Sequence, residues 1–202
     1  VGSQGDGSAQ FVARDAAAQE KLVEIIERDL GMPCLKLTIE AARRVRKAVI
    51  PAAGFGTRLF PASKAMKKEL FPIIDRAGRA KPVILAIVEE ALSAGIEEVC
   101  IIIQPEDRPL FEEFFGPPPI EHYNKLPRDA QAYARYITDI GQRITWLPQE
   151  RQEGFGHAVY CTRDWVDDEP FLLMLGDHLY ASDTDVSCAR QLLDVYERVG
   201  HS

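Results

Sequence analysis

The fold of this chain is decided by the stretch Lys47-Ala-Val-Ile-Pro-Ala-Ala-Gly54-Phe-Gly56-Thr57-Arg58-Leu59-Phe60-Pro61. Residues 47–52 are mostly apolar and include the β-branched pair Val49 and Ile50, which predicts a β-strand. The turn that follows contains two glycines, which allow backbone conformations that other residues rarely adopt. The stretch therefore predicts a strand that ends in a tight turn.

The rest of the chain alternates between helical and extended patterns. Some segments place apolar residues at helical spacing, and short β-branched or apolar runs stand between them. The expected helices are residues 82–94, 107–115, 128–140 and 156–163, and the expected strands are residues 99–103, 143–147 and 171–175. Strands that alternate with helices predict an α/β fold, doubly wound, with a mostly parallel sheet.

The first 46 residues do not follow this alternation. Residues 1–9 are rich in Gly, Ser and Gln, which indicates a flexible linker or expression-tag residues. Residues 10–46 are expected to form an N-terminal helical extension, because apolar residues recur at helical spacing between Leu22 and Leu30. Residues 47–202 are expected to form the α/β domain.

The composition argues against several classes of protein. The 24 basic and 31 acidic residues give a net charge of −7, so no nucleic acid partner is expected. No apolar run approaches the ~20 residues that span a bilayer, and the N-terminus lacks the apolar segment of a signal peptide. We therefore expect a cytoplasmic location and no membrane partner. The four cysteines form no CxxC pair, which argues against a zinc or redox motif.

The glycine-containing turn after the first strand is suited to binding phosphate. Its small residues let the backbone approach a ligand, and successive N–H groups form a concave anion site, helped by the N-terminus of a following helix. Arg58 adds a planar guanidinium that matches phosphate oxygens. The turn lacks the dinucleotide-binding fingerprint, because Leu59 stands at the third glycine position, and it lacks the Gly-Lys-Ser/Thr of a P-loop.

A longer pattern around this turn resembles a known family. The run Gly54-x-Gly-Thr-Arg-Leu-x-Pro-(x)6-Lys68-(x)3-Pro72 is similar to the signature of the sugar-1-phosphate nucleotidyltransferases. The resemblance implies a Rossmann-like nucleotidyltransferase fold, in which Arg58 holds the β and γ phosphates and Lys68 bridges the α phosphate and the sugar phosphate. It also implies nucleotide contacts from Ala52, Ala53, Gly54, Gly56 and Thr57. One departure is Lys67, which stands where the uridylyl enzymes often carry Pro.

A second segment narrows the resemblance to one branch of the family. The run Gln149-(x)4-Gly154-x-Gly-His-Ala-Val is similar to the corresponding segment of the bacterial UTP–glucose-1-phosphate uridylyltransferases. A Gln amide offers the donor and the acceptor that match uracil. The resemblance implies that Gln149 and the Gly154 backbone contact the base. The alternative is a surface Gln149 beside a simple turn, and we expect His157 to be structural or adjacent to the substrate.

A third segment supplies a candidate metal ligand. The apolar residues 171–175 are followed by Gly176 and Asp177, and ligands of open parallel sheets bind beyond the carboxyl ends of strands. A carboxylate there suits Mg²⁺, and the family resemblance implies that Asp177 is the metal-binding Asp. The alternative is that Asp177 caps the next helix.

The reaction that the resemblance implies is transfer of a uridylyl group from UTP to a sugar 1-phosphate, with glucose 1-phosphate as the expected sugar. Related enzymes that use dTTP, CTP or ATP stay as alternatives, as does a non-catalytic nucleotide-sensing module. A non-catalytic module would be expected to lose Arg58, Lys68 or Asp177, and all three are present. Because the sugar-binding segments of the family come later in the chain, residues 47–202 are expected to be the nucleotide-binding part, incomplete at the C-terminus and inactive alone. A homo-oligomer is left open.

Overall fold

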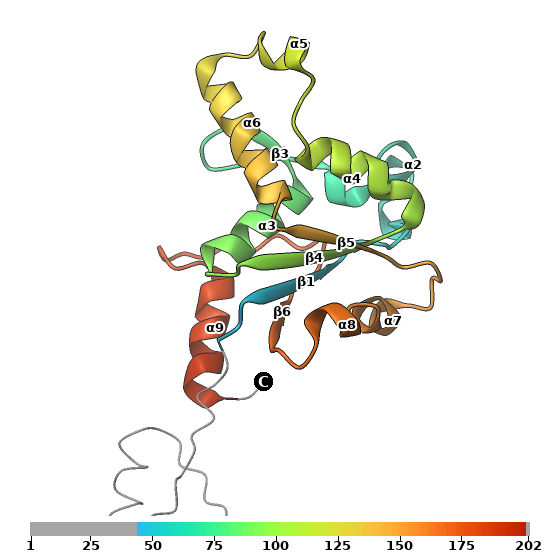
Figure 1. The fold of residues 1–202 in the computed structure, drawn as a ribbon, viewed down its shortest axis with the longest axis vertical. Coiled ribbons are helices and arrows are strands. Elements are labelled where there is room, and N and C mark those ends of the chain that lie inside the picture. Colours follow the sequence, from blue (N-terminus) through green and yellow to red (C-terminus); the bar gives the residue numbers. More distant parts are fainter. Residues whose placement is uncertain (1–43, 201–202) are drawn as a thin grey trace, which may run out of the picture. The chain divides into compact units, whose positions relative to one another are not determined.

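The computed structural model describes residues 44–200, of which residues 44–193 form one compact unit. The centre of this unit is a parallel sheet in the order β5-β4-β1-β6 (Figure 1). Its strands are β1 (Lys47–Pro51), β4 (Glu98–Ile103), β5 (Ile144–Pro148) and β6 (Phe171–Leu173). The predicted doubly wound, mostly parallel sheet is confirmed. The helical extension predicted within residues 10–46 lies outside the described residues, apart from positions 44–46.

The order of the strands reverses once, between β1 and β6. The chain runs outward from β1 to β4 and β5, and then returns to the other side of β1 to form β6. Beyond β6, the N–H groups of Met174 and Gly176 donate to the carbonyl oxygens of Val49 and Pro51, at 2.9 and 3.3 Å. The residues that follow β1 and β6 therefore meet at the same edge of the sheet, which is where ligands bind in folds of this type.

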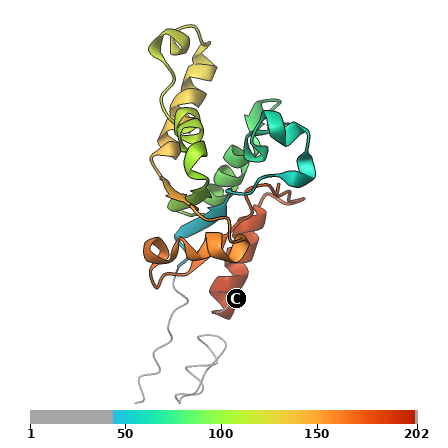
Figure 2. The same ribbon diagram turned by 90° about the vertical axis from the view of Figure 1, so that its right-hand side faces the viewer.

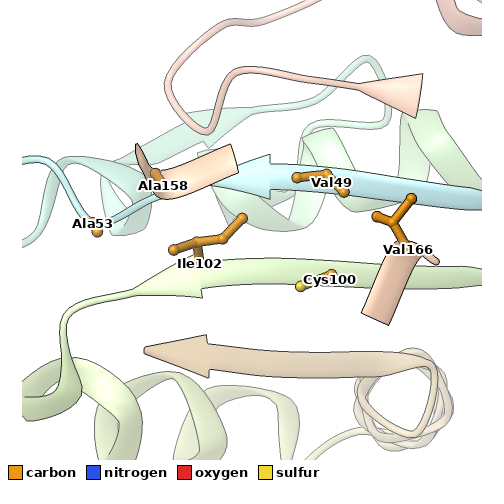
Figure 3. Packing of buried hydrophobic residues seen from close by; sticks show 6 residues of the cluster. All are labelled: Val49, Ala53, Cys100, Ile102, Ala158 and Val166. Atoms are coloured by element: carbon orange, nitrogen blue, oxygen red, sulfur yellow. The ribbon is translucent and has the colours of Figure 1, made fainter. Parts of the chain in front are cut away.

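Helices cover both faces of the sheet, as Figure 2 shows from the side. On one face lie α7 (Phe155–Tyr160) and α8 (Arg163–Val166). Ala158 of α7 and Val166 of α8 are buried against the apolar side chains of β1 and β4 (Figure 3). The buried members of this cluster are Val49, Ala53, Cys100, Ile102, Ala158 and Val166. Burial of this surface is the main favourable contribution to folding on this side.

The other face is covered by α3 (Val83–Ser93) and α4 (Arg108–Phe115) (Figures 1 and 2). One stripe of α3 is fully buried, as the helical spacing of its apolar residues predicted. The rings of Phe111 and Phe115 on α4 lie 5.6 and 5.7 Å from the ring of Trp146 on β5, centroid to centroid. These aromatic contacts connect α4 to the edge of the sheet.

The other helical segments are short or peripheral. They are η1 (Thr57–Leu59), α2 (Ala62–Ala65), η2 (Lys68–Leu70), η3 (Pro105–Asp107), α5 (Ile120–Tyr123), α6 (Arg128–Gly141) and α9 (Cys188–Val199). Within residues 44–200, no helix combines the length and the apolar character needed to cross a membrane.

Three local predictions differ from the structure. The expected helix 156–163 is two helices, α7 and α8, because the chain turns at Cys161 and Thr162, where the Thr162 hydroxyl donates to Val159 O at 2.7 Å. The expected strand 171–175 is shorter, since β6 ends at Leu173. The glycine turn after β1 leads into the three-residue 3-10 helix η1 and not directly into an α-helix.

An antiparallel hairpin after Lys68 had no clear signal in the sequence. It consists of β2 (Pro72–Ile74) and β3 (Ala80–Pro82). Asp75 fixes the turn by accepting the N–H groups of Ala77 and Arg79, each at 2.9 Å. These hydrogen bonds lower the pKa of Asp75. The strands are too short for their alternation to be recognised from the sequence.

Candidate active site

The residues with functional chemistry follow the four parallel strands at one edge of the sheet. The Gly54 loop follows β1, Gln104 follows β4, Gln149 follows β5, and Asp177 follows β6. The carboxyl ends of parallel strands lie at a common edge, so residues far apart in the sequence are placed together. The centre of this arrangement is the pair β1 and β6, where the strand order reverses.

The loop after β1 presents backbone donors. Gly56 has φ +66°, a left-handed conformation that favours glycine. Within residues 44–200, the N–H groups from Gly54 to Arg58 donate to no backbone carbonyl. Backbone N–H groups left free at a strand end suit the oxygens of a phosphate chain. Arg58 is exposed and forms no ion pair with another residue of the described segment.

Lys68 is the centre of the candidate site. It begins η2, and its Nζ lies 2.7 Å from Oδ2 of Asp177, which follows β6. The side chain is only 15% exposed. A Cβ added to Gly54 would lie 3.6 Å from the Nζ of Lys68, so the loop and the ammonium group are neighbours. The structure therefore brings together Lys68, Gly54 and Asp177, which the sequence had indicated as three separate candidates.

Asp177 lies in a tight turn against the end of β1. A Cβ added to Gly176 would lie 2.7 Å from the carbonyl oxygen of Pro51, so only glycine allows this close approach. The hydrogen bond from Lys68 lowers the pKa of Asp177, and the charges of Lys68 and His178 lower it further, against the raising effect of partial burial. Because α9 begins only at Cys188, Asp177 does not cap it.

The carboxylate of Asp177 is suited to be one ligand of a hard cation. Its Oδ2 contacts Lys68, and its Oδ1 lies 3.9 Å from Nε2 of His178. Nowhere in residues 44–200 do three or more His, Cys, Asp or Glu side chains converge as a metal site. Asp177 therefore fits a metal held jointly with substrate phosphates, which is the usual arrangement for Mg²⁺.

Glu69 is a further charged residue at the site, and sequence reasoning missed it. Its side chain is fully buried, and its Oε1 lies 3.4 Å from the Nζ of Lys68. Burial raises its pKa to about 7, against the lowering effect of Lys68. Lys68 thus lies between two carboxyl groups. A Glu next to a Lys in sequence looks like a solvated pair, so nothing in the pattern indicated burial.

Gln149 is buried, with 3% of its surface exposed, so it is not the surface residue of the alternative interpretation. Its Nε2 donates to Gly154 O at 3.0 Å and lies 3.1 Å from Nδ1 of His157. Gly154 has φ +99°, in the region that favours glycine. Gln149 therefore connects β5 to the turn before α7, and its Oε1 is the amide atom that these contacts leave for a ligand. His157 contacts the Gln149 amide through Nδ1, and its role, structural or adjacent to the substrate, stays a prediction.

A large groove lies next to this site without including its central residues. It has a volume of about 950 Å³ and borders Lys67 and Asp107, but not Lys68 or Asp177. Its walls are mostly apolar and come from the segment before Lys68, the hairpin, α4 and α6; they include Met66, Leu70, Pro72, Leu110, Phe114 and Ile137. The groove is therefore a separate feature from the Lys68 and Asp177 pair at the strand ends.

Gln104 is another residue that sequence reasoning missed. It is 3% exposed, and its Nε2 donates to the carbonyl oxygen of Ala53 at 2.7 Å. Lys67 donates to its Oε1 at 3.3 Å. The rule that ligands bind beyond strand ends could have indicated Gln104, because it directly follows β4. Its contact with the Gly54 loop could not have been predicted from spacing.

Comparison with known proteins defines the class to which this fold and site belong. A model of the nucleotidyl transferase family matches residues 47–192. The chain therefore belongs to the nucleotidyl transferase family. Enzymes of this family generally use a divalent metal.

The relatives narrow this assignment. The chain is 41% identical over 162 residues to a UTP–glucose-1-phosphate uridylyltransferase of Staphylococcus epidermidis, which covers 79% of this chain and 54% of that protein. The corresponding protein of Staphylococcus haemolyticus is 40% identical, with the same coverage. The chain thus spans about half the length of the curated relatives it matches.

Solved structures agree with the sequence relatives. A UDP-glucose pyrophosphorylase complexed with UDP-glucose is similar with a TM-score of 0.60 and 30% identity, covering 76% of this chain and 53% of that one. A UTP-bound UDP-glucose pyrophosphorylase from Acinetobacter baumannii also has a TM-score of 0.60, with 27% identity and coverage of 75% and 52%. The predicted resemblance is confirmed by both comparisons.

Proposed function

We propose that the whole protein transfers a uridylyl group from UTP to glucose 1-phosphate, giving UDP-glucose and pyrophosphate. The similarity to proteins named for this reaction supports the proposal. This chain would supply the nucleotide-binding half of the catalytic domain. The cytoplasmic location and the oligomeric state stay predictions.

The proposed reaction is an in-line displacement at the α phosphorus of UTP. An oxygen of the sugar phosphate forms the new bond, the bond between the α phosphorus and the bridging oxygen breaks, and pyrophosphate leaves. The attacking phosphate is already ionised, so no general base is required. Catalysis then depends on positioning the two phosphates and on stabilising the negative charge that develops between them.

Each residue of the candidate site has one role in this proposal. The free N–H groups of the Gly54 loop and Arg58 hold the β and γ phosphates. Lys68 gives up its contact with Asp177 and contacts the α phosphate and the incoming sugar phosphate instead. A preorganised ammonium at this place stabilises the transition state more than the ground state.

We assign the proposed metal, Mg²⁺, to Asp177. The carboxylate of Asp177 is ionised at neutral pH, as an Asp ordinarily is, and the hydrogen bond from Lys68 lowers its pKa further. When bound, Mg²⁺ would supply Lewis-acid neutralisation of phosphate charge. Asp177 would hold the ion jointly with phosphate oxygens, because no group of three or more ligand side chains surrounds it in the described segment.

Gln149 is the proposed determinant of base choice. Its buried amide is fixed by the contacts with Gly154 and His157. A fixed acceptor at Oε1 suits the N3–H donor of uracil, which cytosine lacks. The Gly154 backbone is the proposed second contact with the base.

The observation that carries this function is the convergence of Lys68, Asp177 and the Gly54 loop where the strand order reverses. The test is a pyrophosphate-release assay of the whole protein with Mg²⁺, glucose 1-phosphate and each of UTP, dTTP, CTP and ATP. We expect turnover with UTP above the other nucleotides. Turnover with another nucleotide would identify a related transferase, and nucleotide binding without turnover would identify a sensing module.

A further inference from the structure

Lys67, where the resemblance leads us to expect Pro, forms a network that joins the Lys68 turn to the turn after β4 and, through Gln104, to the Gly54 loop. Its Nζ lies 2.6 Å from Oδ2 of Asp107, the residue that precedes α4. The same Nζ donates to Oε1 of Gln104 at 3.3 Å. Asp107 and Gln104 are both buried, whereas Lys67 keeps 25% of its side chain exposed. A Pro at this position could form neither contact.

The network ends on both sides at proposed catalytic groups. On one side, Gln104 donates from Nε2 to the carbonyl oxygen of Ala53, at the start of the Gly54 loop. On the other side, the carbonyl oxygen of Lys67 accepts the N–H of Leu70 at 2.9 Å and so begins the turn that contains Lys68. The Gly54 loop and the Lys68 turn are thus joined through the amide of Gln104 and the ammonium group of Lys67.

Asp107 is oriented within this network by the backbone. Its N–H donates to Gln104 O at 3.0 Å, so the acid and the amide that contact Lys67 belong to one tight turn after β4. Both residues therefore have a fixed position relative to the sheet. Removing the ammonium of Lys67 would leave the Asp107 carboxylate buried without its cation, which proteins tolerate poorly.

We propose that Lys67, Gln104 and Asp107 are positioning residues that hold the Lys68 turn in register with the nucleotide loop. This proposal rests on the proposed function, because the catalytic roles of Lys68 and the Gly54 loop come from that function. The network acts through Lys68 and contacts no substrate. Its contribution is geometric, since a displacement of about 1 Å at a catalytic group costs on the order of 100-fold in rate.

The test compares three substitutions in the whole protein. Lys67→Met keeps most of the apolar stem and removes the charge, Gln104→Leu removes the amide at similar volume, and Lys67→Arg keeps the cation. We expect Lys67→Met and Gln104→Leu each to lower kcat by about 10- to 100-fold, with a change in KM for UTP of less than about threefold. The double variant should be no slower than the slower single variant, because both break one network. Lys67→Arg should retain most of the activity.

Two controls separate positioning from general destabilisation. Lys64→Met removes an exposed lysine from the same segment and should leave kcat unchanged. Amide hydrogen exchange in the absence of nucleotide should speed up in Lys67→Met at Leu70 and Phe71, whose N–H groups bond within the Lys68 turn, but not in β4.

The outcomes distinguish this proposal from the proposed function. If the unsubstituted protein turns over and Lys67→Met matches it in kcat, the positioning role is wrong and the function stands. An equal loss in Lys67→Met and Lys67→Arg would also overturn it. If the unsubstituted protein neither binds nor turns over UTP, the function fails, and unchanged exchange at Leu70 and Phe71 would still refute the network.

Discussion

Nζ of Lys68 and Oδ2 of Asp177 lie 2.7 Å apart, although the two residues are 109 positions apart in the chain. The ion pair joins η2 to the turn after β6 at the point where the strand order reverses. In this arrangement each group neutralises the charge of the other. In the proposed function, the ammonium would leave this partner to contact phosphate, so the ion pair is the state in which the structure shows the site.

Replacing Lys68 by Ala should slow catalysis far more than it weakens UTP binding. The ammonium lies beside the Gly54 loop, where the reacting phosphate is proposed to bind. Loss of one preorganised charge of this kind costs roughly 3–4 kcal/mol, or ~10²–10³ in kcat. Steady-state kinetics of the whole protein, together with calorimetric titration with UTP, would measure both effects.

The matched control for this prediction is Lys64→Ala, which removes an exposed lysine four residues earlier. Its kcat should equal that of the unsubstituted protein. Near-normal turnover of Lys68→Ala would remove Lys68 from the mechanism, whatever its effect on UTP affinity.

Replacing Asp177 by Asn should raise the Mg²⁺ concentration needed for half-maximal activity. An Asn keeps the shape of the side chain but loses the negative charge that a hard cation prefers. We expect a change of at least ~10-fold, the lower end of the effect of losing metal-site partners. The measurement is a Mg²⁺ titration of pyrophosphate release at saturating UTP.

The control for Asp177→Asn is Asp183→Asn, at an exposed position in the following loop. It should leave the Mg²⁺ dependence unchanged. If Asp177→Asn shows the same Mg²⁺ dependence as the unsubstituted protein, the metal is held elsewhere.

Much of the fold could be predicted from the sequence because burial leaves a periodic signal. The β-branched run of β4 and the apolar stripe of α3 each specify an element through their spacing alone. The hairpin β2–β3 could not be predicted, because its register depends on the Asp75 turn and on pairing over three residues. The division of α7 from α8 depends on a single turn at Thr162 and left no trace in the pattern.

Candidate residues were singled out where the sequence contains a long motif or a strand end, and missed where they depend on burial. Lys68 was singled out by the motif and Asp177 by the rule for strand ends, and the structure adds that their side chains are in contact. Glu69 and Gln104 are buried through contacts between distant segments, and polar residues at such positions look solvated in sequence. The base-contacting role of Gln149 stays a prediction, since its burial is explained by the protein's own hydrogen bonds.

Replacing Glu69 by Gln should change the pH dependence of stability. Burial raises the pKa of Glu69 from 4.5 to about 7, so the folded protein holds this proton more tightly than the unfolded chain. The stability that the group contributes is fully present below pH 4.5 and is lost as pH rises through about 7. The Gln variant cannot lose a proton and should lack this decline.

The measurement is urea unfolding of both proteins below pH 4.5 and above pH 7. The free energy of unfolding of Glu69→Gln relative to the unsubstituted protein should rise by on the order of 2–3 kcal/mol across this window. Glu121→Gln, at an exposed position, is the control and should show no such change. A constant difference for Glu69→Gln at all pH values would show that folding does not raise the pKa of Glu69.

Replacing Gln149 by Ala should reduce the preference for UTP over CTP. The amide is buried and its NH2 group is used by Gly154 O and His157, so Oε1 is the proposed acceptor for the N3–H of uracil. Cytosine has no hydrogen at N3, so the unsubstituted site would face it with an unpaired acceptor. Loss of the discriminating contact should decrease the ratio of kcat/KM for UTP to kcat/KM for CTP. The decrease should correspond to a free-energy change on the order of 1–3 kcal/mol. Because the substitution also releases Gly154, both nucleotides should bind more weakly, and only the ratio tests base choice. Gln152→Ala, an exposed neighbour whose Nε2 contacts Gln149 O at 3.4 Å, is the matched control and should keep the ratio. An unchanged ratio in Gln149→Ala would assign Gln149 a purely structural role at the turn before α7.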